Sequence, residues 1–142
     1  MLFLVHHADA VGPDVDAQRP LSSAGRRHCE QLASRAAERG VKPDVVWHSG
    51  KLRARQTAEA FWRACNPLAE LAAIRGLQPS DPPEWIRDRL TAEERTVMLV
   101  GHMPSLPRVM AMLCGVEGGF PLHGLVALDL EGGRWVERWR LE

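Results

Sequence analysis

Apolar residues form short uninterrupted runs, separated by longer segments in which apolar and polar positions recur with a helical period. The segments that contain these runs are residues 2–5, 44–47 and 96–100, of which the last two begin with the polar residues Asp44 and Thr96. A short, continuous apolar run is typical of a strand that is buried on both faces of a sheet. We therefore expect three buried strands, with 96–100 as the central one because its residues are mostly β-branched or apolar.

The segments between these runs predict helices. In the first, residues 23–39, Ser22 or Ser23 can cap the start, and Gly40 ends the helix. Apolar residues of this segment fall on one inward stripe. Further helices are expected over 51–64, 82–94 and 105–113, and a short strand followed by a loop is expected within 68–77.

The C-terminal part of the chain has two strand-like segments, 125–130 and 135–141, with Glu131-Gly132-Gly133 between them. This pattern predicts an antiparallel hairpin. Helices that separate strands predict an α/β fold, a three-layer α/β/α arrangement whose central, mostly parallel sheet ends in this hairpin. The sequence has no internal repeat and no low-complexity tract, so we expect residues 1–142 to form a single domain.

The charge balance narrows the classes of partner. The chain has 18 Lys and Arg residues against 18 Asp and Glu residues, so it lacks the basic excess of nucleic-acid and membrane-surface binders. Three cysteines without metal-site spacing predict reduced thiols. The apolar run at the N-terminus is too short for a signal peptide or a membrane span. We expect a cytoplasmic protein with no nucleic-acid and no membrane partner.

Histidine and arginine residues follow three of the expected strands. His6 and His7 end the first strand, Ser49 follows the second with Arg53 one helical turn beyond, and His102 follows the central strand. Ligands of open α/β sheets bind beyond the carboxyl ends of the strands. A helix that begins near Arg53 would also favour an anion. We therefore expect a binding site at this edge of the sheet.

Phosphoryl transfer is the chemistry that such a cluster suits. A phosphoryl group carries charge on several oxygens and needs positioned cationic and N–H donors. A neutral imidazole is a competent nucleophile near pH 7, and an arginine binds two oxygens at once. The sequence offers no carboxylate cluster that could hold a metal ion. We therefore expect neither a metal nor a cofactor.

Four segments together resemble a known family. Residues 4–10 resemble the Arg-His-Gly or Arg-His-Ala motif of the histidine phosphatase superfamily, and residues 19–25 resemble its Arg-Pro-Leu-Thr-x-x-Gly segment. Residues 49–57 resemble its Ser-Pro-x-x-Arg-Ala-x-Gln-Thr segment, and residues 100–102 resemble its second histidine motif. The four motifs occur in the order that the family has, which makes the resemblance specific.

This resemblance implies a phosphoglycerate mutase-like fold and a metal-independent phosphatase that forms a phosphohistidine intermediate on His7. Arg53 and His102 would complete the catalytic set by binding the phosphoryl group. The phosphate-binding set would comprise His6, Arg19, Ser49, Arg53 and His102. The short chain is similar to the SixA-like phosphohistidine phosphatases. The implied substrate is therefore phosphohistidine on a protein such as a phosphotransfer domain.

The chain departs from the family pattern at His6, which stands where the family has an arginine. A histidine supplies a positive charge only when it is protonated, and it lacks the planar fork of arginine. An adjacent phosphate favours protonation. These properties predict a weaker phosphate pocket whose activity rises toward mildly acidic pH, up to an optimum set by the need for a neutral His7.

Two questions stay open at the level of sequence. Asp81 or Glu84 could act as the general acid, although Asp81 also suits a turn ahead of Pro82. The substrate could instead be a small phosphorylated metabolite. With His6 in place of the arginine, the domain could also be a weakly active or inactive module that binds phosphate without turnover.

Overall fold

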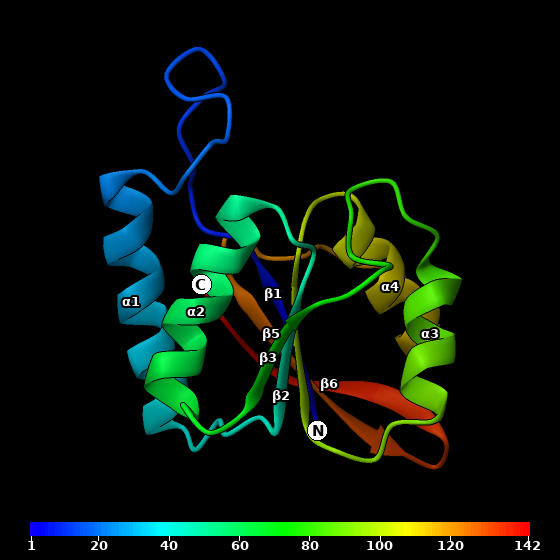
Figure 1. Cartoon of the computed structure of the whole chain (residues 1–142). Coiled ribbons are helices and arrows are strands. Elements are labelled where there is room, and N and C mark those ends of the chain that lie inside the picture. Colours follow the sequence, from blue (N-terminus) through cyan, green and yellow to red (C-terminus); the bar gives the residue numbers. More distant parts are fainter.

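One six-stranded sheet forms the centre of the structure, a computed structural model that describes all 142 residues (Figure 1). The strands are β1 (Leu2–His6), β2 (Val45–His48), β3 (Glu70–Ala73), β4 (Val97–Gly101), β5 (Leu125–Glu131) and β6 (Arg134–Leu141). They lie in the order β3-β2-β4-β1-β5-β6. The pairs β1/β4, β2/β3 and β2/β4 are parallel, whereas β1/β5 and β5/β6 are antiparallel.

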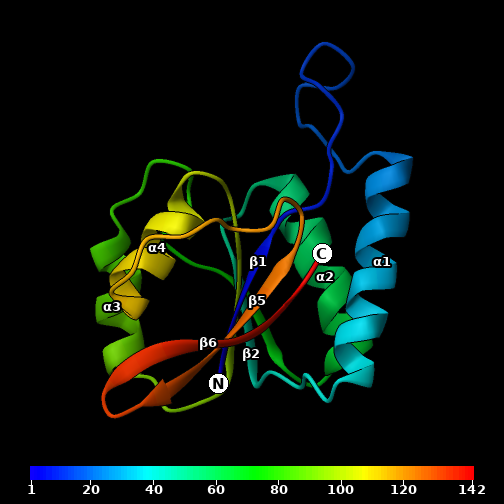
Figure 2. The ribbon, with the colours of Figure 1, turned by 180° about the vertical axis from the view of Figure 1, so that it is seen from behind.

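Helices cover both faces of this sheet. The helices are α1 (Ser23–Glu38), α2 (Leu52–Cys65), α3 (Pro83–Thr91) and α4 (Ser105–Cys114). Helices α1 and α2 lie on one face, and α3 and α4 lie on the other (Figures 1 and 2). Apolar cores of 16 and 15 buried residues fill the two faces. Because both faces are covered, β1, β2 and β4 are buried along their whole length, which confirms the predicted three-layer α/β fold.

Local signals set the ends of the helices. Ser22 is the N-cap of α1, and its hydroxyl accepts a hydrogen bond from the Gly25 N–H. Gly115 ends α4 in the left-handed conformation, with φ +73°. Helix α3 ends at Thr91, before the predicted residue 94. Its last buried residue is Leu90, so a further turn would bury nothing.

The C-terminal hairpin follows the prediction. Gly132 and Gly133 form its turn with φ +59° and +80°, a backbone that glycine adopts without strain. Strand β5 places its first four residues in the core and exposes its last two. No helix in the structure has the length and apolar character needed to cross a membrane.

The parallel strands place their carboxyl ends at one edge of the sheet. His6 lies beside Gly101 in the β1/β4 register, and His48 lies beside Val100 in the β2/β4 register. The residues that follow these strands, His7, Ser49 and His102, therefore start from adjacent positions. The loop over residues 9–20 rises above this edge, away from the body of the fold (Figure 1).

Candidate active site

Side chains from four segments meet at this edge. The ring centroid of His7 lies 4.5 Å from that of His6 and 5.0 Å from that of His102. The first turn of α2 contributes Arg53. Its positive charge lowers the pKa of His6, His7 and His102, and the Thr57 side chain links the Arg53 carbonyl to the amide that follows His7. The structure thus brings together the three residues that the sequence predicts to be catalytic.

One nitrogen of the His7 ring is fixed by the backbone. Nδ1 lies 2.7 Å from the carbonyl oxygen of Ala8. A carbonyl oxygen only accepts, so Nδ1 carries the proton and Nε2 of the neutral ring has a free lone pair. Thr57 holds this segment in place, because its hydroxyl oxygen accepts the Ala8 N–H at 3.0 Å and its O–H donates to the Arg53 carbonyl at 2.8 Å.

The surroundings of His7 keep its ring neutral. Burial is the main cause that lowers its pKa, from 6.5 to about 4, and the hydrogen bond to Ala8 only partly opposes it. The positive charges of Arg53 and Arg19 lower the pKa further. A neutral imidazole with a free lone pair is the form that acts as a nucleophile.

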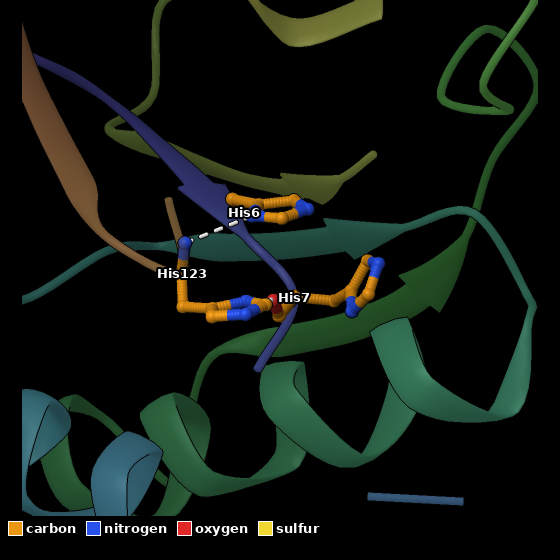
Figure 3. A group of neighbouring side chains, drawn as sticks. All are labelled: His6, His7 and His123. Carbon is orange, nitrogen blue, oxygen red and sulfur yellow. Dashed lines mark hydrogen bonds between the residues drawn. The ribbon is translucent and has the colours of Figure 1, made fainter. Parts of the chain in front are cut away.

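His6 does not supply the positive charge expected from the sequence. Its Nδ1 accepts the backbone N–H of His123 at 2.8 Å (Figure 3). The neutral ring therefore carries its proton on Nε2, and a second proton on Nδ1 would break this bond. Burial, followed by the neighbouring His7, lowers the pKa of His6 to about 3. His6 is thus a neutral N–H donor, which removes the reason to expect activity to rise toward acidic pH.

His102 is almost fully buried, with 1% of its surface exposed. Its Nε2 lies 2.7 Å from the Ser49 hydroxyl, and its Nδ1 has no hydrogen-bond partner in the protein. Burial lowers the pKa of His102 to about 3. Ser49 therefore contacts His102, and the Ser49 hydroxyl also accepts the Lys51 N–H at 3.3 Å. Because that amide precedes the helix, Ser49 does not cap the Arg53 helix, and α2 begins without a side-chain cap.

Arg53 also has a buried donor without a partner. Its Nε makes no hydrogen bond to any protein atom. Burial, followed by the charge of Arg19, lowers the pKa of the Arg53 guanidinium, which places Arg19 next to it. Arg19 is anchored by its Nε, which donates to the Val11 carbonyl at 2.9 Å. Gln56 anchors the end of the same loop, because its side-chain oxygen accepts the Leu21 N–H at 2.8 Å.

The two candidate general acids lie in the segment that follows β3. The carboxylate of Asp81 accepts the backbone N–H groups of Gly76 and Gln78, at 3.2 and 2.9 Å. It closes the turn, as the sequence also allowed. Glu84 lies in the first turn of α3. The segment approaches the site through Gln78, whose side chain donates to the Ser49 carbonyl at 2.7 Å.

Three histidines raise the question of a metal ion. Ligand atoms of His6, His7 and His123 lie within 4.8 Å of one another. His7 and His123 each donate from Nδ1 to a carbonyl, so the Nε2 lone pair of each neutral ring is free. His6 has no free lone pair, because its Nδ1 accepts the His123 N–H and its Nε2 carries the proton. The His6 and His123 rings are stacked at an interplanar angle of 5°, so their nitrogens do not aim at one point. With Arg53 beside it, the cluster suits an anion better than a metal ion.

Sequence reasoning missed two residues of this site. Thr57 lies four positions after Arg53 in the same motif, and this spacing puts both on one helix face. That signal could have identified Thr57. His123 follows a proline-containing loop and has no motif of its own, yet its ring stacks on His6 with centroids 4.9 Å apart. Nothing in the sequence places it there.

The largest cavity lies elsewhere. It measures about 670 Å³ and is lined by residues at the opposite end of the sheet, including Met1, Arg95 and Trp135. No histidine lines it. A smaller groove of about 380 Å³ lies beside Arg53 and is also lined by Lys51 and Arg55. The chemistry therefore points to the histidine cluster and the groove next to it.

Comparisons with known proteins agree with this geometry. Residues 7–95 match the family model of the histidine phosphatase superfamily, branch 1. One similar solved structure is described as a proposed phosphohistidine phosphatase SixA from Agrobacterium tumefaciens. It is 30% identical to this chain, with a TM-score of 0.85, and the match covers 99% of this chain and 96% of that one. The protein histidine phosphatase SixA in complex with tungstate shares the fold at 24% identity, with a TM-score of 0.88 over 99% of this chain and 95% of that one.

A curated relative matches part of the chain. An uncharacterized protein from Picosynechococcus sp. is 31% identical over 104 residues, which span 70% of this chain but only 62% of the relative. The family model alone covers more than half of the chain, including His7 and Arg53. The chain therefore belongs to the histidine phosphatase superfamily.

Proposed function

We propose that the protein is a metal-independent phosphatase that removes the phosphoryl group from phosphohistidine on a protein. His7 is the nucleophile in this proposal. Arg53 and His102 bind the phosphoryl oxygens, and His6 adds a neutral N–H donor. Arg19 supplies positive charge at the rim, and Ser49 orients His102.

One observation carries the proposal. Arg53 Nε and His102 Nδ1 are buried without a hydrogen-bond partner, the His102 ring centroid lies 5.0 Å from that of His7, and the positive charge of Arg53 acts on His7. A buried polar group without a partner costs about 1–3 kcal/mol, so such groups are rare unless a ligand satisfies them. If the Ser49 hydroxyl donates to His102 Nε2, the proton of the neutral ring lies on Nδ1. Two unpaired donors beside a nucleophile match an anionic electrophile.

The reaction takes two transfers. In the first, the His7 Nε2 lone pair attacks phosphorus, the bond from phosphorus to the substrate imidazole breaks, and that imidazole takes a proton from solvent. In the second, water attacks phosphorus, the bond from phosphorus to His7 Nε2 breaks, and inorganic phosphate leaves. The donors stabilise the charge on the phosphoryl oxygens in both steps. The imidazole of a phosphohistidine leaves without strong acid assistance, which suits a site where the Asp81 carboxylate already closes a turn.

The surface around the site supports a protein substrate. The groove beside Arg53 is lined by exposed residues of the 9–20 loop and of the start of α2. A second groove of about 320 Å³ opens next to His123. Two grooves that flank the reacting group leave room for the chain of a macromolecule on both sides. The similar SixA proteins are named for phosphohistidine, which agrees with this substrate class.

The test compares a histidine-phosphorylated peptide, phosphoramidate and a simple phosphomonoester as substrates. We expect turnover of the two P–N substrates and at least about a 1,000-fold loss of kcat in His7→Ala, as for removal of other nucleophiles. The control is Asp88→Ala, at an exposed position of helix α3 that lines neither groove. Mass spectrometry of the quenched reaction should find the phosphoryl group on the peptide that contains His7. Full activity of His7→Ala would overturn the proposal.

The same assay resolves the alternative functions. His6 in place of the family arginine favours a binding module, and that module would bind tungstate without turning over any substrate. A metabolite phosphatase would turn over small phosphomonoesters faster than the phosphorylated peptide. Either result would replace the proposed substrate class.

A further inference from the structure

His123 contacts both histidines of the first motif, although no motif includes it. Its backbone N–H donates to His6 Nδ1 at 2.8 Å, and its ring Nδ1 lies 2.7 Å from the His7 carbonyl oxygen (Figure 3). The carbonyl only accepts, so the His123 ring is the donor. One residue therefore holds the side chain of His6 and the backbone of His7 at the same time.

The turn that carries His123 is itself tied to β1. The Gly124 N–H donates to the Pro121 carbonyl at 3.1 Å, and the His6 N–H donates to the Gly124 carbonyl at 3.0 Å. His123 has φ +54°, in the left-handed region that residues other than glycine adopt only occasionally, although histidine, asparagine and aspartate are enriched there. An unfavourable backbone conformation is kept only where the surroundings fix it. The ring bond to His7 and the stacking on His6 are the contacts that fix it here.

This arrangement determines which proton the phosphate pocket receives from His6. An imidazole free in solution exchanges between two neutral tautomers. With Nδ1 occupied by the His123 N–H, only the tautomer with the proton on Nε2 is compatible with the structure. The rings of His6 and His7 extend to the same side of the β1 end (Figure 3). His6 can thus offer a fixed N–H donor at the side where the His7 ring lies.

We propose that His123 is a positioning residue that selects the Nε2–H tautomer of His6 and fixes the backbone of His7, so that a neutral histidine works where relatives have an arginine. This inference rests on the proposed phosphatase function. His123 itself does not react with the substrate. Its side chain acts by anchoring the turn to the His7 carbonyl, and the turn then aims its N–H at His6.

Three substitutions of His123 separate the contributions. His123→Asn keeps a residue that tolerates a positive φ and a side-chain N–H close to the position of Nδ1. His123→Gly relieves the backbone strain but removes the donor. His123→Ala removes the donor and keeps the strain. Arg108→Asn is the control, because Arg108 is exposed on α4, lines neither substrate groove and makes no hydrogen bond to His6 or His7.

We expect kcat for phosphoramidate to fall about 10-fold in His123→Gly and His123→Ala, since small misplacements of reacting groups have effects of this size or larger. His123→Asn should stay within about 3-fold of the wild-type kcat. The midpoint of thermal unfolding is measured for each variant, and kcat is corrected for the folded fraction. A Gly variant with wild-type kcat, or an Asn variant as slow as the Gly variant, overturns the proposal.

Nitrogen NMR of the histidine rings gives a second readout that does not need activity. In the wild type, His6 should show an unprotonated Nδ1 and a protonated Nε2, and in His123→Gly it should show a mixture of tautomers. Unchanged His6 tautomers in His123→Gly would overturn the proposal. If the wild type turns over no substrate but the tautomer responds as expected, only the phosphatase function fails.

Discussion

Four imidazole rings lie in one cluster, and each has one ring nitrogen in a hydrogen bond to a neighbouring protein group. Nδ1 is the bonded atom in His6, His7 and His123, and Nε2 is the bonded atom in His102. These bonds decide which nitrogen of each ring is free, and burial disfavours protonation. His6, His7 and His102 thus provide neutral groups of defined polarity, whereas positive charge comes from arginine.

The pKa of His7 tests this account directly. Burial is the main reason why this pKa lies below 6.5, and the positive charge of Arg53 lowers it further, to about 4. We predict that NMR titration of the His7 ring finds a midpoint far below 6.5. In Arg53→Gln the midpoint should rise, because a nearby positive charge that opposes protonation is lost, yet burial should keep it below 6.5.

The control for this titration is Arg108→Gln, an exposed arginine on α4 outside the cluster. It should leave the His7 midpoint unchanged. A His7 midpoint near 6.5 in the wild type would mean that the ring is solvated, and the nucleophile would then be mostly protonated in mildly acidic buffer.

Part of this site could be predicted from the sequence, and the rest could not, for a physical reason. His7, Arg53 and His102 follow strands or begin a helix, and the ends of parallel strands share one edge, so their meeting was predictable. The neutral state of His6 was not, because it depends on a backbone N–H more than a hundred residues away in the sequence. Asp81 had two interpretations, and only the turn over residues 76–81 decided between them.

Helix α2 couples the site to the fold through Thr57. Its hydroxyl links the Ala8 amide to the Arg53 carbonyl, so one side chain sets the distance between the nucleophile segment and the arginine helix. Thr57→Val keeps the size but leaves the buried Ala8 N–H without a partner. We predict a loss of about 1–3 kcal/mol in the free energy of unfolding and a lower kcat. Thr57→Ser keeps the hydroxyl and should retain most of both.

Urea unfolding and phosphoramidate turnover of the two variants provide the measurement. Ala58→Ser, at the next position of the same helix, controls for a general effect of polarity in its buried face. A Val variant as stable and as active as the Ser variant would show that the Thr57 hydroxyl does not position His7.

Helix α1 meets the nucleophile loop at Gly25. A Cβ at this position would overlap the carbonyl oxygen of Asp9, and it would lie 2.9 Å from the carbonyl carbon. Backbone atoms cannot move aside as a flexible side chain does, so Gly25→Ala should push Asp9, two residues beyond His7, away from the helix. We predict a loss of about 1–3 kcal/mol in stability, as for overpacked cores, together with reduced turnover.

Ala24→Gly is the control for Gly25→Ala, because it changes an exposed position of the same helix turn in the opposite sense. Its cost should be about 0.5–1 kcal/mol with unchanged turnover, the ordinary effect of glycine in a helix. If Gly25→Ala instead stabilises the protein, as alanine does at unconstrained helix positions, the close approach of Asp9 is not rigid.

Most helix and strand positions were predictable, because buried runs, caps and glycines each act locally. The structure confirms β1, β2, β4 and the hairpin. The prediction was wrong at the end of α3, where charge and helix propensity continue to residue 94 but nothing beyond Leu90 packs against the core. Helix ends that depend on burial, and not on a cap, need the tertiary structure.

The whole molecule is electrically balanced, with 18 basic and 18 acidic side chains, but its charges are not spread evenly. Arg53 and Lys51 lower the pKa of His102, and Arg53 and Arg19 lower that of His7. Positive charge therefore gathers at the carboxyl edge of the sheet. The fold holds this positive charge next to buried imidazoles that must stay neutral. The protonation of these imidazoles is therefore coupled to the stability of the whole fold.

That link predicts how stability depends on pH. The pKa values of His6, His7 and His102 in the folded protein are about 3, 4 and 3, all below the ordinary 6.5 of an unfolded chain. Between about pH 6.5 and pH 4, the unfolded chain therefore binds protons that the folded protein does not bind. The free energy of unfolding should fall as pH decreases through this window, by on the order of 1 kcal/mol per pH unit for each histidine.

Urea unfolding in phosphate-free buffers between about pH 7 and pH 5 measures this slope, and His102→Gln isolates one contribution. Glutamine places its side-chain amide close to the position of Nε2, so the amide oxygen can accept from the Ser49 hydroxyl while the titrating group is removed. The slope of this variant should be roughly one quarter smaller than in the wild type, since it loses one of the four histidines whose pKa is lowered in the folded protein, His6, His7, His48 and His102. An equal slope in both proteins would mean that His102 takes up its proton in the folded state, and a protonated His102 is incompatible with the buried, neutral cluster on which the proposed chemistry depends.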